Sequence, residues 1–319
     1  MATKDGRLVI ALEEHYYDPE VAASYGNDRQ PARIRERLDD VGEFRLKEMD
    51  EGGIDVQVLS HGAPSTQRMD PETAVRMARG ANDRLKATID GRPDRFAGFA
   101  ALPTPDPKAA ADELERAVTK LGLKGAMVHG LTNGVFFDDR RFWPICERAQ
   151  DLDVPIYLHP ATPHPTVTEL YYGDYVKDFP QINTAGWGFT VETATQAIRM
   201  VLSGVFEAYP RLKIILGHLG EGLPFSLWRI DHSFSRPGNM PMAFKDTFCE
   251  HFWITTSGNF STSAVLCSMM EMGIDRILFS IDYPFVENPP GTEWMEGIPL
   301  SSEDRNKILH GNVKRLLKM

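Results

Sequence analysis

The amino-acid sequence predicts an α/β protein with one domain, a (β/α)₈ barrel that spans residues 1–319. Eight short apolar runs alternate with helical segments along the whole chain. Because a helix follows each run, we expect the strands to pair in parallel through right-handed crossovers. The chain length also fits a barrel of this kind with loop insertions. An open, doubly wound sheet is the competing arrangement, but no GxGxxG or GxxxxGK[ST] motif follows a predicted strand.

The individual elements follow from hydrophobic periodicity and from residues that start or end helices. Pro71 occupies a first-turn position of a long helix, and Gly52–Gly53 is typical of a helix end. The predicted strands are 8–12, 55–61, 96–102, 124–129, 154–159, 212–218, 252–257 and 276–281. The predicted helices are 43–51, 71–89, 107–121, 141–152, 190–209, 223–235, 241–250, 261–272 and 301–317. Residues 16–42 and 161–187 are predicted to be loops, the second rich in aromatic residues.

Composition narrows the class of protein. The formal net charge is −10 and no basic block occurs, which argues against nucleic acid or an anionic membrane as a partner. The three cysteines, Cys146, Cys249 and Cys267, form no CxxC or CxxH pattern, so we expect free thiols in a reducing compartment. Neither a signal peptide nor a membrane span is expected. These features predict a cytoplasmic globular protein.

Candidate metal ligands stand at the ends of several predicted strands. Strand one ends at Glu13-Glu14-His15, strand five at His159, strand six at His218 and strand eight at Asp282. The carboxyl ends of barrel strands face a common pocket, and alternation along strand one turns Glu13 and His15 to the same side. Imidazole and carboxylate ligands suit Zn²⁺ or Mn²⁺, and the lack of thiolates argues against a closed structural zinc site.

Each of these residues has a simpler interpretation when it is taken alone. Asp282 could cap the turn that follows its strand. Glu13 and His15 could form an ion pair at the barrel rim, and His159 could be a hydrogen-bonded core histidine. His218 differs, because its flanking glycines leave the imidazole accessible. The conjunction at the ends of four strands favours a metal site over the separate interpretations.

Several motifs resemble those of the metal-dependent hydroxybenzoate decarboxylases of the amidohydrolase superfamily. That group includes the γ-resorcylate (2,6-dihydroxybenzoate), 2,3-dihydroxybenzoate and 5-carboxyvanillate decarboxylases, and the similarity runs along nearly the whole chain. The motifs are ALEEH (11–15), LHP (158–160), GHLGEGLP (217–224), WRIDH (228–232), TTSGN (255–259) and FSIDYPF (279–285). The resemblance implies an amidohydrolase-type barrel.

The resemblance also implies roles for particular residues. Glu13, His15, His159 and Asp282 would bind the metal. His218, braced by Glu221, would lie beside the substrate with Asp282 as the catalytic acid. The implied substrate contacts are Arg229, His129 and Phe285.

Two positions indicate the branch of the superfamily to which the chain is similar and the number of metal ions that it would bind. Hydrolytic relatives usually carry His-x-His on strand one, whereas this chain has Glu13-x-His15, as in the decarboxylase branch. Relatives with two metals carry a bridging lysine at the end of strand four. Here His129 occupies that place and Lys124 lies at the other end of the strand, so one divalent ion is expected.

The implied reaction is the non-oxidative decarboxylation of an ortho-hydroxybenzoate, such as 2,6- or 2,3-dihydroxybenzoate, to a phenol and CO₂. The metal would chelate the carboxylate and the ortho oxygen, and Asp282 would protonate the ring. No organic cofactor is expected. The alternatives are a metal-dependent hydrolase of the lactonase or amidase type, or another lyase, on the same barrel, and a scaffold without catalysis. We expect a homodimer or homotetramer, with 161–187 as an interface, a lid or a loop packed on its own barrel.

Overall fold

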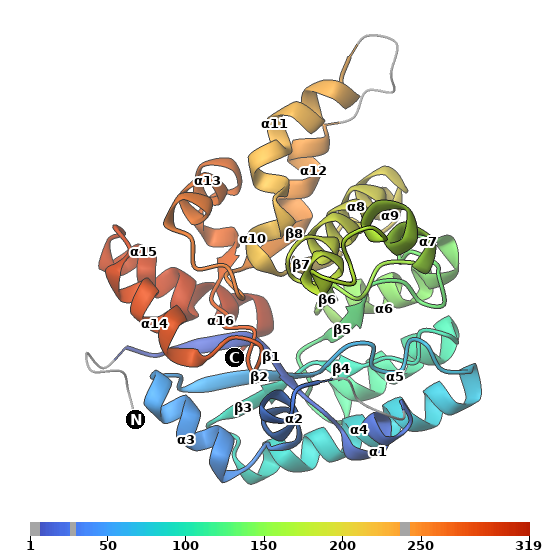
Figure 1. Cartoon of the computed structure of the whole chain (residues 1–319), viewed down its shortest axis with the longest axis vertical. Coiled ribbons are helices and arrows are strands. Elements are labelled where there is room, and N and C mark those ends of the chain that lie inside the picture. The colour runs from blue at the N-terminus through green and yellow to red at the C-terminus, as the bar shows by residue number, and fades with distance from the viewer. Residues whose placement is uncertain (1–6, 26–29, 237–242) are drawn as a thin grey trace.

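The computed structural model describes residues 7–25, 30–236 and 243–319, and nine parallel strand segments in these ranges form a barrel wall (Figure 1). Neighbouring strands are also consecutive in the chain, as expected for repeated βα units. The strands are β1 (Ile10–Tyr16), β2 (Val56–His61), β3 (Phe96–Gly98), β4 (Ala100–Ala101), β5 (Ala126–His129), β6 (Pro155–His159), β7 (Lys213–Leu216), β8 (Phe252–Thr255) and β9 (Ile277–Leu278).

The nine segments correspond to the eight predicted strands, because β3 and β4 are the two halves of the third. The break lies at Phe99, whose N–H donates to Leu59 O at 2.9 Å, while the next N–H, of Ala100, donates to Gly125 O at 2.9 Å. The chain thus changes partner from β2 to β5 within one strand. On the other side, His15 N–H donates to Tyr283 O at 2.7 Å and Glu14 bridges Tyr283 in parallel, so the last strand end meets β1. These contacts confirm the predicted (β/α)₈ barrel.

A β-bulge in β1 decides which side chains face the barrel interior. Ala11 pairs with Gln57, but Glu14 pairs with Leu59, so three steps along β1 match two along β2. Ile10 and Leu12 pack in the barrel interior, and without the bulge Glu13 would point outward. The extra residue turns Glu13 and His15 inward and Glu14 outward.

The helices cover the outside of the barrel (Figure 1). Most of the longer ones agree with the predicted ranges to within a few residues. The helices are α1 (Pro19–Ala23), α2 (Ala32–Asp39), α3 (Glu43–Gly52), α4 (Pro71–Gly91), α5 (Pro107–Thr119), α6 (Trp143–Leu152), α7 (Pro165–Val167), α8 (Gly188–Leu202), α9 (Val205–Ala208), α10 (His218–Glu221), α11 (Leu223–Phe234), α12 (Phe244–His251), α13 (Thr262–Met272), α14 (Asn288–Gly297), α15 (Ser302–Asn306) and α16 (Asn312–Leu317).

Several predicted boundaries were wrong. The predicted loop 16–42 contains α1 and α2, and the predicted loop 161–187 contains α7 and short helical turns. The predicted helix 190–209 is broken at Gly204, which has φ +83°, and α14 was not predicted. The predicted helix 241–250 begins at Phe244, and its first two positions lie outside the described residues. The helix predicted at 301–317 is divided into α15, a π-helical turn and α16.

Side chains from the last helix close the barrel interior at the end where the strands begin. Val313, Leu316 and Leu317 of α16 pack against Ile10 and Leu278 inside the barrel. This apolar plug leaves the carboxyl ends of the strands as the place where polar side chains gather.

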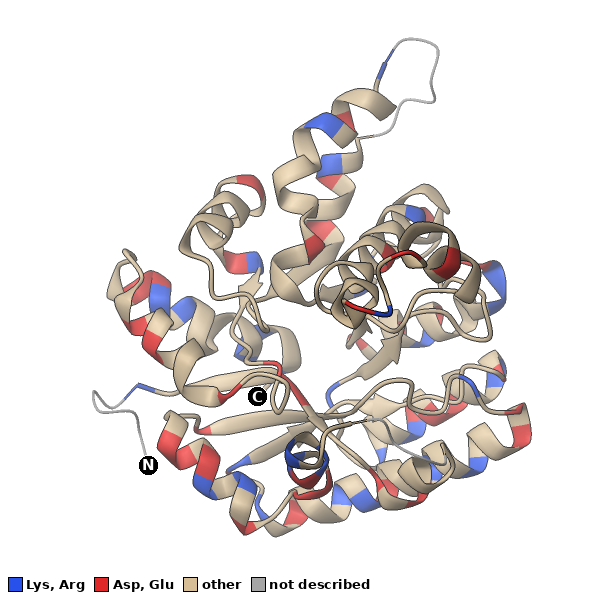
Figure 2. Ribbon diagram, in the orientation of Figure 1, with Lys and Arg blue, Asp and Glu red and all other residues tan. Residues whose placement is uncertain are grey.

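Charged side chains are interspersed on the outer helices, as Figure 2 shows for α4 and α5. Arg116 of α5, for example, pairs with Asp83 of α4 at 2.6 Å and with Glu113 at 2.8 Å. The three cysteines are free thiols, as predicted. Among the described residues, no helix has both the length and the apolar composition needed to cross a bilayer.

Glu192 on α8 gives a pH-dependent prediction for stability. It is buried, and its Oε1 has no hydrogen-bond partner in the described part of the chain. Burial raises the pKa of Glu192 to about 7, against the opposing effects of the His164 main chain and Arg68. A carboxyl group with a raised pKa favours folding while it is protonated, and this stability is lost as the pH rises through about 7.

We therefore expect Glu192→Gln to stabilise the protein more at pH 8.5 than at pH 5.5, because the amide stays neutral at both. Urea unfolding at the two pH values measures this difference, with the exposed Glu207→Gln as a matched control. The same change in unfolding free energy at both pH values would contradict the assignment.

Candidate active site

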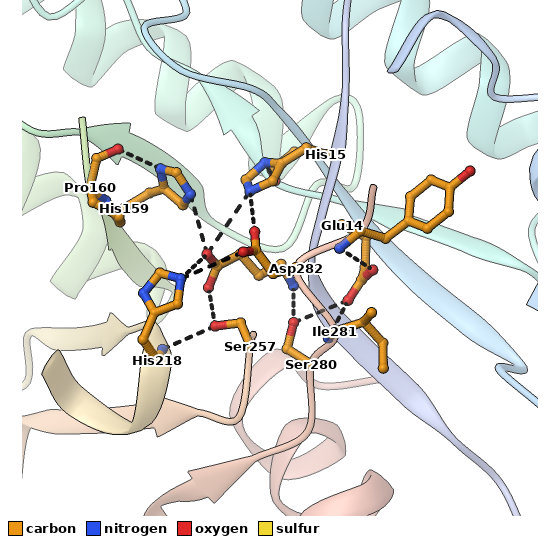
Figure 3. Close-up of polar contacts among 12 residues, drawn as sticks. Glu14, His15, His159, Pro160, His218, Ser257, Ser280, Ile281 and Asp282 are labelled. Atoms are coloured by element: carbon orange, nitrogen blue, oxygen red, sulfur yellow. Dashed lines mark hydrogen bonds and ion pairs between the residues drawn. The ribbon is translucent and has the colours of Figure 1, made fainter. Parts of the chain in front are cut away.

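Four side chains that suit a metal ion meet at the carboxyl ends of the strands. Glu13 and His15 come from β1, His159 ends β6, and Asp282 follows β9; one ligand atom from each lies within 4.8 Å of all the others. Glu13 Oε1 is 3.2 Å from His159 Nε2 and 3.9 Å from His15 Nε2, which is itself 3.5 Å from Asp282 Oδ1. The structure thus brings together all four predicted ligands, of which Figure 3 labels His15, His159 and Asp282.

The two imidazoles are held with the same nitrogen pointing inward. His15 Nδ1 is 3.2 Å from Ser60 Oγ, and His159 Nδ1 donates to Pro160 O at 2.7 Å. Each Nε2 is therefore left to face the cluster. Glu13 Oε1 and His15 Nε2 are buried without a hydrogen-bond partner in the described chain. Because buried polar atoms normally have partners, a cation between these atoms fits the donor set.

The second oxygen of Glu13 is fixed by hydroxyl groups. Tyr157 and Ser257 donate to Glu13 Oε2, the latter at 2.6 Å. Burial alone would raise the pKa of Glu13, but the imidazoles of His218 and His159, with a smaller effect of His15, hold it well below its ordinary value. These contacts therefore favour the carboxylate form of Glu13, which can bind a cation.

His218 stands at the rim of this cluster, on a turn with a left-handed backbone. His218, Leu219 and Glu221 have φ between 51° and 56°, in the left-handed region that residues with a side chain rarely adopt. Nδ1 donates to Glu221 Oε1 at 2.6 Å, and Nε2 lies 3.5 Å from Glu13 Oε1 and 3.8 Å from Asp282 Oδ2. Burial lowers the pKa of His218, but Glu221, Glu13 and Asp282 outweigh it and raise the pKa well above its ordinary value.

A cavity of about 340 Å³ opens above the cluster. His159, His218, Asp282 and Phe285 line it, together with segments 160–162 and 184–185. The Phe285 ring centroid is 5.8 Å from that of His15, so an aromatic surface stands beside the ligand atoms. The predicted loop 161–187 therefore borders the cavity.

Two predicted substrate contacts do not line this cavity. His129 is buried behind His159, with its Nδ1 at 3.0 Å from His159 Nδ1. Arg229 is exposed on α11, which projects with α12 away from the barrel (Figure 1). Neither residue is among those that surround the cavity.

Two residues near the cluster were missed from the sequence. Arg68 lines the cavity and donates to Thr162 O at 3.2 Å; among the described residues it is the one Lys or Arg in the lining. Glu14 is fully buried on the other side of β1, where it accepts hydrogen bonds from the segment that carries Asp282. The alternation of strand residues indicated that Glu14 points away from the ligands, but no pattern indicated what it contacts.

Burial raises the pKa of Glu14 to about 8, opposed by the Ile281 N–H group, the Ser280 hydroxyl and the Arg45 guanidinium. The hydrogen bonds act in the opposite sense to burial. Every group that contacts the two oxygens of Glu14 is a hydrogen-bond donor, and this arrangement favours the carboxylate form.

Comparisons with known proteins agree with this geometry. A family model described as amidohydrolase matches residues 15–319. The γ-resorcylate decarboxylase of Polaromonas sp. strain JS666 is 42% identical over 325 aligned residues, which cover 97% of this chain and 98% of that protein. A solved structure of dihydroxybenzoic acid decarboxylase from Polaromonas sp. JS666, with manganese and the inhibitor 2-nitroresorcinol, is 42% identical with a TM-score of 0.90. It covers 98% of this chain and 97% of that one.

A more distant solved structure, 5-carboxyvanillate decarboxylase from Sphingomonas paucimobilis, is 35% identical with a TM-score of 0.89 and covers 98% of this chain and 99% of that one. The similarity thus extends over nearly the whole chain. The chain belongs to the amidohydrolase family and, within it, to the family of the γ-resorcylate decarboxylases.

Proposed function

We propose that the protein is a metal-dependent carboxy-lyase that converts an ortho-hydroxybenzoate, such as 2,6- or 2,3-dihydroxybenzoate, to the phenol and CO₂. The observation that carries the proposal is the meeting of Glu13, His15, His159 and Asp282 beside a cavity that is lined by His159, Asp282 and the aromatic ring of Phe285. The similarity to γ-resorcylate decarboxylase along 97% of the chain supports this choice of substrate class.

The same four side chains are the proposed ligands of one divalent ion, Mn²⁺ or Zn²⁺. Two imidazoles and two carboxylates without a thiolate suit either ion. When bound, the ion would supply Lewis-acid chemistry to the substrate's carboxylate and ortho oxygen. No organic cofactor is part of the proposal.

Proton transfer is the step assigned to the chain itself. Direct loss of CO₂ would leave an unstable aryl anion, so the ring carbon that bears the carboxylate must first gain a proton. Asp282 lines the cavity and is the proposed acid. The bond to the carboxylate then breaks, CO₂ leaves, and the electron pair of that bond restores the aromatic ring. His218, with Nδ1 bound to Glu221, can donate from Nε2 to a phenolate or carboxylate oxygen.

The remaining predicted contacts are assigned by position. Phe285 would pack against the substrate ring. Arg68, which the sequence did not indicate, would attract the anionic substrate at the cavity wall. His129 would brace the ligand His159 through the 3.0 Å contact between their Nδ1 atoms. Arg229 could meet a substrate only from a second copy of the chain, because it lies on exposed α11 and outside the cavity lining.

We propose that the protein is cytoplasmic and forms a homodimer or a homotetramer, which would supply this second copy. Phe225 and Trp228 on the projecting α11 are 87% and 69% exposed, and Met270 on α13 is 87% exposed. Aromatic residues of segment 161–187, among them Tyr171 and Phe179, are exposed as well. Large exposed apolar side chains grouped on a few elements support a protein interface.

The ortho-hydroxyl group should be required for turnover, because both metal chelation and ring activation use it. With Mn²⁺ or Zn²⁺ added, we expect 2,6- or 2,3-dihydroxybenzoate to release CO₂, while benzoate and 3- or 4-hydroxybenzoate stay unchanged. Product mass and CO₂ release measure this, with a lactone panel alongside. Turnover of 4-hydroxybenzoate at a comparable rate would rule out chelation, and acid release from lactones alone would favour a hydrolase.

A further inference from the structure

Glu14 lies between two proposed ligands in the sequence but on the opposite face of β1. The bulge in β1 pairs Glu14 with Leu59, whose side chain packs in the layer outside the barrel wall. Its carboxylate is fully buried there, beside the segment that follows β9. A buried carboxylate that faces away from the cavity needs a role other than metal binding.

Four donors surround the two oxygens of Glu14. Oε1 accepts from Ser280 Oγ at 3.0 Å and from the main-chain N–H of Ile281 at 3.0 Å. Oε2 accepts from the main-chain N–H of Tyr283 at 3.3 Å and from Gln57 Nε2 at 3.4 Å. Figure 3 shows the Glu14 side chain beside Ser280 and Ile281, while the histidines lie around Asp282 on the other side.

The two main-chain donors are the residues on either side of Asp282. Asp282 has φ +75°, a left-handed conformation that a residue with a side chain rarely adopts. Such a conformation persists where the surroundings hold it. The Glu14 carboxylate bonds the N–H groups before and after Asp282, so it fixes the backbone from which the Asp282 side chain projects into the cluster.

The buried guanidinium group of Arg45 is linked to Glu14 through Gln57. Arg45 on α3 donates to Gln57 Oε1 at 3.2 Å, and Gln57 in turn donates to Glu14. Arg45 also donates to His15 O at 2.5 Å and stacks over the Tyr283 ring at 4.6 Å. The network therefore links the backbone of the ligand His15 with the segment that carries Asp282.

We propose that Glu14 is a positioning residue for Asp282: its carboxylate clamps the main chain on both sides of Asp282 and so aims that side chain at the cluster and the substrate. Its consequence for catalysis rests on the proposed function, whereas the clamp itself does not. Glu14 does not line the cavity and is not one of the four proposed ligands, so it acts on the reaction through Asp282.

Glu14→Gln tests the clamp with almost no change in size. Whichever way the amide is turned, its NH₂ group faces either Ile281 N–H or Tyr283 N–H, and that donor loses its acceptor. In the metal-free protein, we expect amide exchange in the segment 279–286 to become at least about tenfold faster. Hydrogen-exchange mass spectrometry measures this. The matched control is Glu113→Gln, a buried carboxylate on α5 that should leave the segment unchanged.

A double-mutant cycle then tests the link to Asp282. We expect Glu14→Gln to lower kcat by about 10- to 100-fold, the usual effect of losing a partner that orients a ligand. In an Asp282→Asn background the same change should lower the residual kcat less than about twofold, because the residue to be positioned has already lost its function. Glu14→Asp, which keeps a carboxyl group on a shorter side chain, should give an intermediate loss and serves if Glu14→Gln does not fold.

The outcomes are separable. Unchanged exchange in segment 279–286 of a folded Glu14→Gln protein would overturn the clamp. Equal losses of kcat in both backgrounds would show that Glu14 does not act through Asp282. If the wild-type protein decarboxylates no hydroxybenzoate, the proposed function fails, and the exchange measurement still decides the clamp alone.

Discussion

Asp282→Asn should lower kcat by at least 10²–10⁴-fold while the protein keeps most of its metal. The asparagine side chain retains a carbonyl oxygen that can bind the ion, but it has no carboxylic proton to deliver to the ring. Loss of a general acid typically costs about 10²–10⁴ in rate. Steady-state kinetics and metal analysis of the same preparation measure the two effects separately.

The position of Asp282 explains why one residue can serve both roles. Its Oδ1 faces His15 Nε2 at 3.5 Å, and its Oδ2 faces His218 Nε2 at 3.8 Å, at the edge of the cavity. If Asp282→Asn keeps its metal and more than about a tenth of the wild-type rate, Asp282 is not the acid. His218 would then be the next candidate, because its Nε2 lies at the same edge.

His159→Ala should remove metal and activity together. His159 Nε2 is 3.2 Å from Glu13 Oε1 in the cluster, and an alanine side chain has no atom that could bind the metal in its place. We expect the Kd for Mn²⁺ to rise by more than the roughly 10- to 100-fold that follows loss of an outer partner. Thorough chelation of the wild-type protein should likewise abolish turnover, and metal added back should restore it.

A matched control separates metal loss from general damage. His251 is also a buried histidine, held by Leu212 O at 2.9 Å and stacked on Phe206, but it lies on α12 outside the cluster. His251→Ala should bind Mn²⁺ as the wild type does, even if its stability falls. Full activity after chelation, or two tightly bound ions per chain, would contradict the single-ion site.

Much of the fold and of the cluster could be predicted because both follow short-range rules. Apolar runs with a helix after each one require parallel pairing, and parallel strands place their carboxyl ends on one side. This is why His159 and Asp282, 123 positions apart in the printed numbering, could be assigned to one pocket. The alternation that set Glu13 and His15 apart from Glu14 also agrees with the structure.

The parts that could not be predicted depend on tertiary contacts. Alternation counted from the interior residues Ile10 and Leu12 would have turned Glu13 outward, and only the bulge between Ala11 and Glu14 corrects this. The position of Arg229 depends on where α11 leaves the barrel. The burial of His129 depends on its packing against His159. Hydrogen bonds between segments far apart in sequence, such as those from residues 280–283 to Glu14, leave no local pattern.

The most direct measurement of the proposed reaction is the position of solvent hydrogen in the product. The metal-loaded protein should be incubated in D₂O with each ortho-hydroxybenzoate of the panel, and the product analysed by mass and NMR, with an enzyme-free sample as control. The account predicts one equivalent of CO₂ and a phenol that carries one deuterium at the carbon that held the carboxylate. CO₂ release with no deuterium at that carbon, or no CO₂ from any ortho-hydroxybenzoate with Mn²⁺ or Zn²⁺, would contradict it.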